Sequence, residues 1–211
     1  MENFINKITP GIPDSEFLRS KIPMTKEEVR EISLCKLNLK SNSVLYDIGC
    51  GTGSISIESS LLSPELKIFA IDSNPEATEL CTKNQKKFNC KNIQIINESA
   101  PQAFKNLLKP SHAFIGGSGG KLNEILNSLY EKNPNMRIVM NAISLESISQ
   151  IEKIIKTFPI QNDELTLVSI SKAVKVSNFN IMNSLNPVFV FSFDFKKWFW
   201  NLLGEKKWKR T

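Results

Sequence analysis

The sequence is poor in metal-binding residues and in long apolar runs. It has one histidine among 211 residues, and its four cysteines form no C-x-x-C pair. A structural zinc site needs about four such ligands at close spacing, so we predict no metal centre. No stretch approaches the ~20 consecutive apolar residues of a membrane span, and the N-terminus lacks the basic and apolar segments of a secretory signal. We therefore expect a cytoplasmic protein with reduced thiols.

The excess of positive charge is confined to one end of the chain. The formal net charge is +6, and six basic residues and one acid within 196–211 account for five of these charges. Residues 1–195 are nearly neutral, whereas an enzyme acting on nucleic acid usually has a basic patch on its folded body. We therefore predict one domain over 1–195, with a leader at 1–24, no nucleic-acid partner, and a basic aromatic tail at 196–211.

Apolar runs alternate with helical patterns over most of the chain. This alternation predicts an α/β, Rossmann-like fold, in which helices cover both faces of a mainly parallel sheet. Asn74 and Pro75 are a good N-cap and first helical residue, and Thr25 with Glu28 matches a capping box. The expected strands are 43–48, 67–71, 92–96, 111–115, 136–141, 164–171 and 187–194. The expected helices are 25–37, 54–62, 74–88, 101–108, 120–132 and 144–157.

No helix is expected between the last two strands. Only a polar stretch from 172 to 186 separates them, so we predict an antiparallel pair joined by a loop. The complete expectation is a seven-stranded sheet of the class I S-adenosylmethionine (SAM) methyltransferase type, with an antiparallel last strand.

A glycine-rich segment follows the first expected strand. Asp47 precedes Gly49, Gly51 and Gly53, and the spacing G-x-G-x-G differs from the G-x-G-x-x-G of dinucleotide-binding turns. Asp72 ends the second expected strand, where an ionised carboxylate can accept hydrogen bonds from two ribose hydroxyls. An acid before the turn and another after the next strand are typical of SAM methyltransferases, so we predict SAM as the cofactor.

Two further loops are expected at the same edge of the sheet. Glu98, Ser99 and Ala100 follow the third strand, where methyltransferases usually contact adenine. After the fourth strand, Gly116, Gly117, Ser118, Gly119 and Gly120 replace the Asn/Asp-Pro-Pro-aromatic box of many amino-methylating enzymes. Bare backbone amides can receive a carboxylate, so this loop is the predicted substrate site; a flexible turn is the alternative.

Six sequence blocks resemble one family of methyltransferases. The segments 11–17 (GIPDSEF), 23–30 (PMTKEEVR), 47–58 (DIGCGTGSISIE), 70–76 (AIDSNPE), 114–120 (FIGGSGG) and 186–189 (NPVF) are similar to the CbiT family of decarboxylating cobalt-precorrin-6B carbon-15 methyltransferases. The resemblance covers about residues 11 to 193. The leader, the 23–30 segment and the 114–120 loop are the most particular to that family.

The resemblance implies a function and a site. It implies an enzyme of anaerobic cobalamin synthesis that methylates carbon 15 of a corrinoid precursor, cobalt-precorrin-6B, and decarboxylates the ring C acetate. It also implies a homo-oligomer, as a tetramer, and a carbon-5 methyltransferase as the pathway partner. The predicted cofactor-binding residues are Thr25, Asp47, Gly49, Cys50, Gly51, Thr52, Gly53, Asp72, Ser99 and Ala100.

Several residues depart from the family pattern or remain without a role. Ser99 replaces the acid that usually precedes the Ala-Pro pair, and Lys172 replaces an arginine between the last strands. Lys26, Arg30 and Lys121 are candidate partners of substrate carboxylates. Methyl transfer from a sulfonium needs positioning more than a base, so no catalytic residue is assigned. The single histidine, His112, is expected to be structural.

Two other functions stay open from the sequence. A general SAM methyltransferase acting on another small molecule or on RNA would have the same glycine turn. A non-catalytic SAM-binding module that holds a partner through the tryptophan-rich tail is the second alternative.

Overall fold

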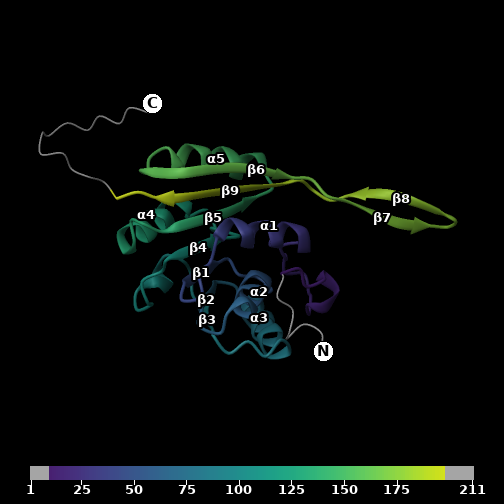
Figure 1. The fold of residues 1–211 in the computed structure, drawn as a ribbon, viewed down its shortest axis with the longest axis horizontal. Coiled ribbons are helices and arrows are strands. Elements are labelled where there is room, and N and C mark those ends of the chain that lie inside the picture. The colour runs from purple at the N-terminus through teal and green to yellow at the C-terminus, as the bar shows by residue number, and fades with distance from the viewer. Residues whose placement is uncertain (1–9, 198–211) are drawn as a thin grey trace, which may run out of the picture.

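A computed structural model describes residues 10–197, which build a seven-stranded sheet with helices on both faces (Figure 1). The strand order is β3-β2-β1-β4-β5-β9-β6. The strands are β1 (Val44–Ile48), β2 (Lys67–Asp72), β3 (Ile93–Asn97), β4 (His112–Ile115), β5 (Arg137–Ala142), β6 (Ile160–Val168) and β9 (Val188–Phe195). Strands β1 to β5 pair in parallel, whereas β9 is antiparallel to both β5 and β6. The predicted sheet and its antiparallel last strand are confirmed.

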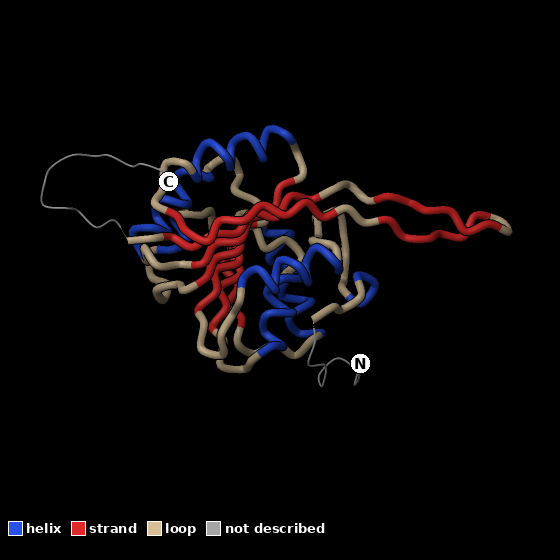
Figure 2. The backbone as a smooth tube through the Cα atoms, turned by 45° about the horizontal axis from the view of Figure 1, so that its top comes forward, coloured by secondary structure: helices blue, strands red, loops and turns tan. Residues whose placement is uncertain are grey.

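Helices cover the sheet in two groups, which the tube view separates (Figure 2). The helices are α1 (Glu27–Leu37), α2 (Ser54–Leu62), α3 (Pro75–Lys87), α4 (Leu122–Lys132) and α5 (Leu145–Ile155). Helices α1, α2 and α3 pack on one face with Leu45, while α4 and α5 pack on the other with Tyr46 and Ile48. Neighbouring residues of one strand therefore enter different cores, because side chains alternate across a strand.

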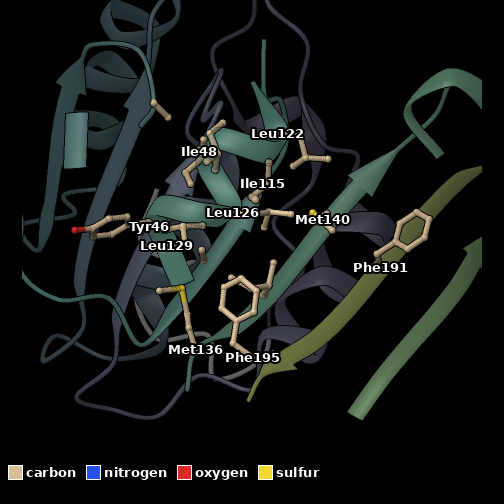
Figure 3. Close-up of a cluster of buried hydrophobic side chains, with 14 of the residues drawn as sticks. Tyr46, Ile48, Ile115, Leu122, Leu126, Leu129, Met136, Met140, Phe191 and Phe195 are labelled. Atoms are coloured by element: carbon tan, nitrogen blue, oxygen red, sulfur yellow. The ribbon is translucent and has the colours of Figure 1, made fainter. Parts of the chain in front are cut away.

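The core on the α4 face is built from long apolar side chains. Figure 3 shows Leu122, Leu126 and Leu129 of α4 among the same cluster of side chains as Ile115 of β4 and Met140 of β5. Their spacing of three and four residues places the leucines on one side of the helix. This packing fixes the start of α4, and with it the loop between β4 and α4.

A buried ion pair fixes the segment that precedes α1. Arg30 of α1 and Glu58 of α2 are 0% and 2% exposed, and Arg30 Nε lies 2.5 Å from Glu58 Oε1. The guanidinium also donates to the carbonyls of Ile12 and Thr25, and the Glu58 carboxylate accepts from the amides of Gly11 and Ile12. The leader is thereby tied to two helices of the body.

Two predictions for the start of α1 are wrong. Arg30 is fully buried against Glu58, so it is not a partner of substrate carboxylates. Thr25 is not a capping residue, because the helix begins at Glu27 with Lys26 as its N-cap and no side-chain cap bond. Glu28 pairs with Lys172 instead. By contrast, Asn74 caps α3 as predicted, with its side chain accepting from the Glu76 amide.

Three segments differ from their predicted form. Only Gln102–Phe104 is helical within 101–108, as a 3-10 turn (η2), and β6 begins at residue 160 with an irregularity between Gln161 and Glu164. The predicted loop 172–186 instead contains β7 (Ser171–Val176) and β8 (Phe179–Ser184), which pair antiparallel. This hairpin projects from the body (Figure 1) and is called the arm below. Its polar residues suggested a loop, although its apolar residues alternate as in a strand.

Several absences hold for residues 10–197. In this range no helix is long and apolar enough to cross a membrane, and no three His, Cys, Asp or Glu side chains gather in a way that could hold a metal. All four cysteines are free thiols. The predicted tail lies mostly outside the described residues.

Substitution of Arg30 by alanine is expected to destabilise the fold. The variant leaves the Glu58 carboxylate buried without its cation, which typically costs about 3–5 kcal/mol of unfolding free energy. Urea unfolding measures the loss. Lys83→Ala is the control, because it breaks an exposed ion pair with Glu79 and should change stability by less than about 1 kcal/mol. Equal effects of the two variants would contradict the role of the buried pair.

Candidate functional site

A cavity of about 320 Å³ lies at the carboxyl ends of β1, β2, β3 and β4. Strand order reverses between β1 and β4, and open α/β sheets bind ligands at such a point. The volume is within the roughly 300–1,000 Å³ common for ligand pockets. The lining residues are Ile22, Pro23, Ile48, Gly49, Gly51, Ile71, Asp72, Ser73, Asn74, Ala77, Glu98, Ser99, Ala100, Gly116, Gly117, Ser118, Gly119 and Ile125.

Asp72 ends β2 at the wall of this cavity. One carboxylate oxygen accepts from the Gly51 amide at 3.0 Å, and the other accepts from the Asn74 amide at 2.9 Å. A carboxylate oxygen can accept two hydrogen bonds, so each oxygen retains a free lone pair. The carboxylate is thus oriented by two loops and can still accept from a ligand.

The turns after β1 and β4 touch through glycine backbones. A Cβ on Gly49 would lie 2.7 Å from the Gly117 nitrogen and 2.8 Å from its carbonyl oxygen, and Gly49 has φ +70°. Any other residue at position 49 would therefore be strained and would push the two turns apart. These two turns together form one wall of the cavity.

The leader closes the cavity from a third direction. Ile22 and Pro23 line it, and a Cβ on Gly51 would lie 2.8 Å from the Pro23 carbonyl oxygen. The Arg30 contact with the Thr25 carbonyl holds the end of this segment. The buried ion pair therefore acts on the shape of the cavity, although neither of its residues lines it.

Asp47 of β1 lies behind the glycine turn, where it contacts the first turn of α2. Its Oδ2 accepts from the Ser56 amide at 3.1 Å and from the Ser56 hydroxyl at 2.5 Å, while Oδ1 has no partner among the described residues. The pKa of Asp47 is raised to about 7, chiefly by burial and to a smaller extent by the charge of Asp72, against the Ser56 hydrogen bonds, which lower it. Asp47 does not line the cavity and instead holds the turn on α2.

The loop after β3 contacts the start of α4. Lys121 Nζ donates to Ser99 Oγ at 3.1 Å, and Ser99 and Glu98 both line the cavity. Ser99 replaces the acid expected from the family pattern, so the lysine meets a neutral acceptor here. Lys121 thus places a positive charge beside this edge of the cavity.

A second, smaller cavity of about 80 Å³ lies on the other side of the Gly116–Ser118 turn. It lies between the carboxyl ends of β4 and β5 and residues of α4 and α5. Its lining residues are Ile115, Gly116, Gly117, Ser118, Leu122, Met140, Asn141, Ser147, Gln150 and Ile151. The two cavities share Gly116, Gly117 and Ser118, so the turn separates two neighbouring spaces.

The structure brings many of the predicted site residues together. Gly49, Gly51, Asp72, Ser99 and Ala100 line the larger cavity, as do four of the five predicted substrate-loop residues. The predicted site residues that line neither cavity are Thr25, Asp47, Cys50, Thr52, Gly53 and Gly120.

Packing explains two of these exceptions. Gly53 is the N-cap of α2, and a Cβ there would lie 2.4 Å from Cys81 Sγ. Thr52 is 1% exposed, and its carbonyl accepts from Asn84 of α3. Both residues join the turn to helices behind it.

Sequence reasoning missed part of the lining. Asn74 and Ala77 follow Asp72 closely in the sequence, and this closeness could have indicated that they line the same cavity. Ile22 and Pro23 come from the leader, whose path depends on the buried ion pair, and no local pattern indicated it.

His112 lies far from this chemistry. It begins β4, at the opposite end of that strand from the cavity, and its Nδ1 lies 2.8 Å from Ser111 Oγ. Burial lowers the pKa of His112 to about 4. A neutral, buried imidazole at that position agrees with a structural role.

Solved structures identify the class. The fold is that of Rossmann-like methyltransferases; a SAM-dependent O-methyltransferase from Thermotoga maritima has a TM-score of 0.73 at 12% identity, covering 87% of this chain and 69% of that one. The precorrin-6y C5,15-methyltransferase of Geobacter metallireducens has a TM-score of 0.83 at 34% identity, covering 88% of this chain and 98% of that one.

Sequence comparison identifies the family. The model of the precorrin methyltransferase domain matches residues 16–194, so the chain belongs to the precorrin methyltransferase family. A probable cobalt-precorrin-6B C(15)-methyltransferase (decarboxylating) of Saccharolobus solfataricus is 38% identical, covering 89% of this chain and 96% of its own. The cobalt-precorrin-6B C(15)-methyltransferase (decarboxylating) of Salmonella typhi is 37% identical over 84% of this chain and 92% of its own length. The resemblance stated from the sequence is confirmed.

Substitution of Gly49 by alanine should separate the two glycine turns. The methyl group meets backbone atoms that cannot rotate away, and φ +70° is unfavourable for alanine, so we expect a loss of about 1–3 kcal/mol of unfolding free energy. Chemical denaturation measures it. Gly117→Ala is the matched control, since its Cβ meets nothing within 4 Å, and it should change stability by less than about 0.5 kcal/mol. A neutral Gly49→Ala variant would refute the close contact.

Substitution of Asp47 by asparagine should alter the pH dependence of stability. The pKa of Asp47 is raised from 3.8 in the unfolded chain to about 7, so the native protein binds the proton more tightly. Its stability relative to Asp47→Asn should therefore fall as pH rises from about 4 to 7 and stay constant above, by a few kcal/mol at ~1.4 kcal/mol per pKa unit. Urea unfolding of both proteins at pH 4.5 and 8 tests this. If the unfolding free energies of the two proteins changed equally between these pH values, the raised pKa of Asp47 would be contradicted.

Proposed function

We propose that this protein is a SAM-dependent methyltransferase of anaerobic cobalamin synthesis. In this proposal it methylates carbon 15 of cobalt-precorrin-6B and removes the ring C acetate carboxyl group as carbon dioxide. The larger cavity carries the proposal, because a glycine turn and an oriented carboxylate meet there at the point where strand order reverses. Family membership and the names of the curated relatives support the choice of acceptor.

The lining of the larger cavity fits the parts of SAM. The free lone pairs of Asp72 suit the two ribose hydroxyls, and the backbone of Gly49 and Gly51, which lines the cavity, suits the amino-acid end. Adenine would lie against Ser99 and Ala100. The Gly116–Ser118 turn would then lie beside the methyl group that is transferred.

The chemistry asks the protein mainly to position two reactants. The methyl group leaves the sulfonium in line with the attacking carbon, and holding both in this geometry can supply a large share of the rate enhancement. None of the described residues is proposed as a general base. The amides of Gly116 and Gly117 donate to the Ile48 carbonyl, so the amides of residues 118–120, together with Lys121, would orient substrate carboxylates.

Incubation with SAM and cobalt-precorrin-6B tests the activity. The expected product has gained one methyl group and lost one carbon dioxide, which mass spectrometry detects. Asp72→Ala should weaken SAM binding by roughly tenfold or more, because the charged acceptor of the ribose is removed. Lys83→Ala is the control, since Lys83 contacts neither cavity. Intact substrate after incubation with SAM-saturated protein would refute the proposed acceptor, while a general methyltransferase function would remain.

The arm supports a further part of the proposal, a homo-oligomer. In the pairing of β7 with β8, Val176 lies opposite Phe179 and Val174 opposite Ile181, so four apolar side chains share one face. All four are exposed, and a two-stranded hairpin alone is marginally stable in water. We propose that arms of copies of this chain cover each other, as a tetramer. The carbon-5 methyltransferase is proposed as the pathway partner, and the four free thiols fit a cytoplasmic location.

Paired substitutions in the arm test the assembly. Phe179→Asp places a charge on the apolar face and should shift the protein to a smaller species in light scattering at micromolar concentration. Asn180→Asp adds the same charge on the opposite face and should leave the assembly unchanged. Dissociation by both variants, or by neither, would contradict an interface through the apolar face.

A further inference from the structure

The smaller cavity differs in chemistry from the larger one. Asp72 and Glu98 line the larger cavity, and Lys121 lies beside it. The smaller cavity is lined by apolar side chains and by the uncharged groups of Ser118, Asn141, Ser147 and Gln150, and none of its described lining residues is charged. A carboxylate in this space can accept hydrogen bonds but meets no cation of the lining.

Asn141 lines this cavity at the end of β5, but its side-chain amide contacts α1. Ser33 of α1 is fully buried, and its hydroxyl donates to the Val29 carbonyl at 2.7 Å and accepts from Asn141 Nδ2 at 3.1 Å. Because α1 packs on the opposite face of the sheet from α4 and α5, this amide is directed away from Ser147 and Gln150 of α5. The uncharged polar side chains that the cavity offers to a ligand are therefore those of Ser118, Ser147 and Gln150.

The size of the smaller cavity limits what it can hold. One water molecule needs roughly 10–15 Å³ of cavity volume, measured as the space open to the centre of a water-sized sphere. The 80 Å³ present accommodates a group of a few atoms, such as a carboxymethyl side chain, but not a macrocycle. The shared Gly116–Ser118 turn places such a group next to the proposed methyl donor.

We propose that the smaller cavity receives the acetate carboxylate that the reaction removes as carbon dioxide, with the uncharged polar groups of Ser118, Ser147 and Gln150 orienting it. The proposal rests on the function proposed above. During decarboxylation the negative charge leaves the carboxylate, so a cation beside it would stabilise the reactant more than the transition state. Uncharged donors in an apolar space orient the carboxylate without that penalty.

The electrons balance within the two reactants. The bond between the acetate methylene and its carboxylate breaks, and its electron pair enters the conjugated system of the macrocycle. Carbon 15 uses a pair of that system to bond the methyl group, and the sulfur of SAM keeps the pair of the broken carbon–sulfur bond. One carboxylate charge and one sulfonium charge disappear together, so the net step needs neither an oxidant nor an added proton.

Addition of a cation to the smaller cavity tests this inference. Gln150→Lys and Ser147→Lys each place an ammonium group in the lining, and Ser149→Lys adds one on the same helix outside it. The measured quantity is carbon dioxide released per methyl group transferred, from carboxyl-labelled cobalt-precorrin-6B and methyl-labelled SAM. We expect this ratio to fall by roughly tenfold or more in at least one lining variant, with a methylated product that retains the carboxylate, and to stay unchanged in Ser149→Lys.

Three outcomes would overturn the inference. These are an unchanged ratio in both lining variants, an equal loss of both activities, and a fall of the ratio in Ser149→Lys as well. Failure of the proposed function has a different result, since the wild-type protein would then transfer no methyl group and release no carbon dioxide.

Discussion

The site depends on the close contact between Gly49 and Gly117. Parallel strands β1 and β4 are neighbours, so their turns meet at one edge of the sheet, and only a residue without a Cβ at position 49 permits the distance found there. The contact closes one side of the larger cavity and, through Gly116 and Gly117, forms a side of the smaller one. Two adjacent cavities suit a reaction in which two groups of one substrate change next to a single methyl donor.

The buried pair of Arg30 and Glu58 supplies the remaining side. Its hydrogen bonds hold the leader, whose Ile22 and Pro23 line the larger cavity. Burying two charges is costly unless their hydrogen-bonding capacity is satisfied, and the leader carbonyls and amides provide that satisfaction. The leader and the ion pair are therefore interdependent. This connection gives a physical reason for a leader that resembles the family as closely as the glycine turn does.

Local patterns predicted much of the fold and part of the site. Alternating strands and helices indicated the sheet, and three residues of the acid-glycine pattern, Gly49, Gly51 and Asp72, line one cavity. The failures have non-local causes. Arg30 resembled a surface cation until the fold buried it against Glu58, 28 residues away. The arm is different: its polar residues favoured a loop, although the alternation of Val174 with Val176 and of Phe179 with Ile181 was a local indication of strands.

A structure of the protein with S-adenosylhomocysteine, the demethylated product of SAM, tests the central claim most directly. We predict that the ribose hydroxyls lie within hydrogen-bonding distance of the Asp72 carboxylate, that adenine contacts Ser99 and Ala100, and that the sulfur lies beside the Gly116–Ser118 turn, facing the smaller cavity. Binding elsewhere, or with the sulfur directed away from that turn, would contradict the assignment of the two cavities to the methyl donor and the acceptor.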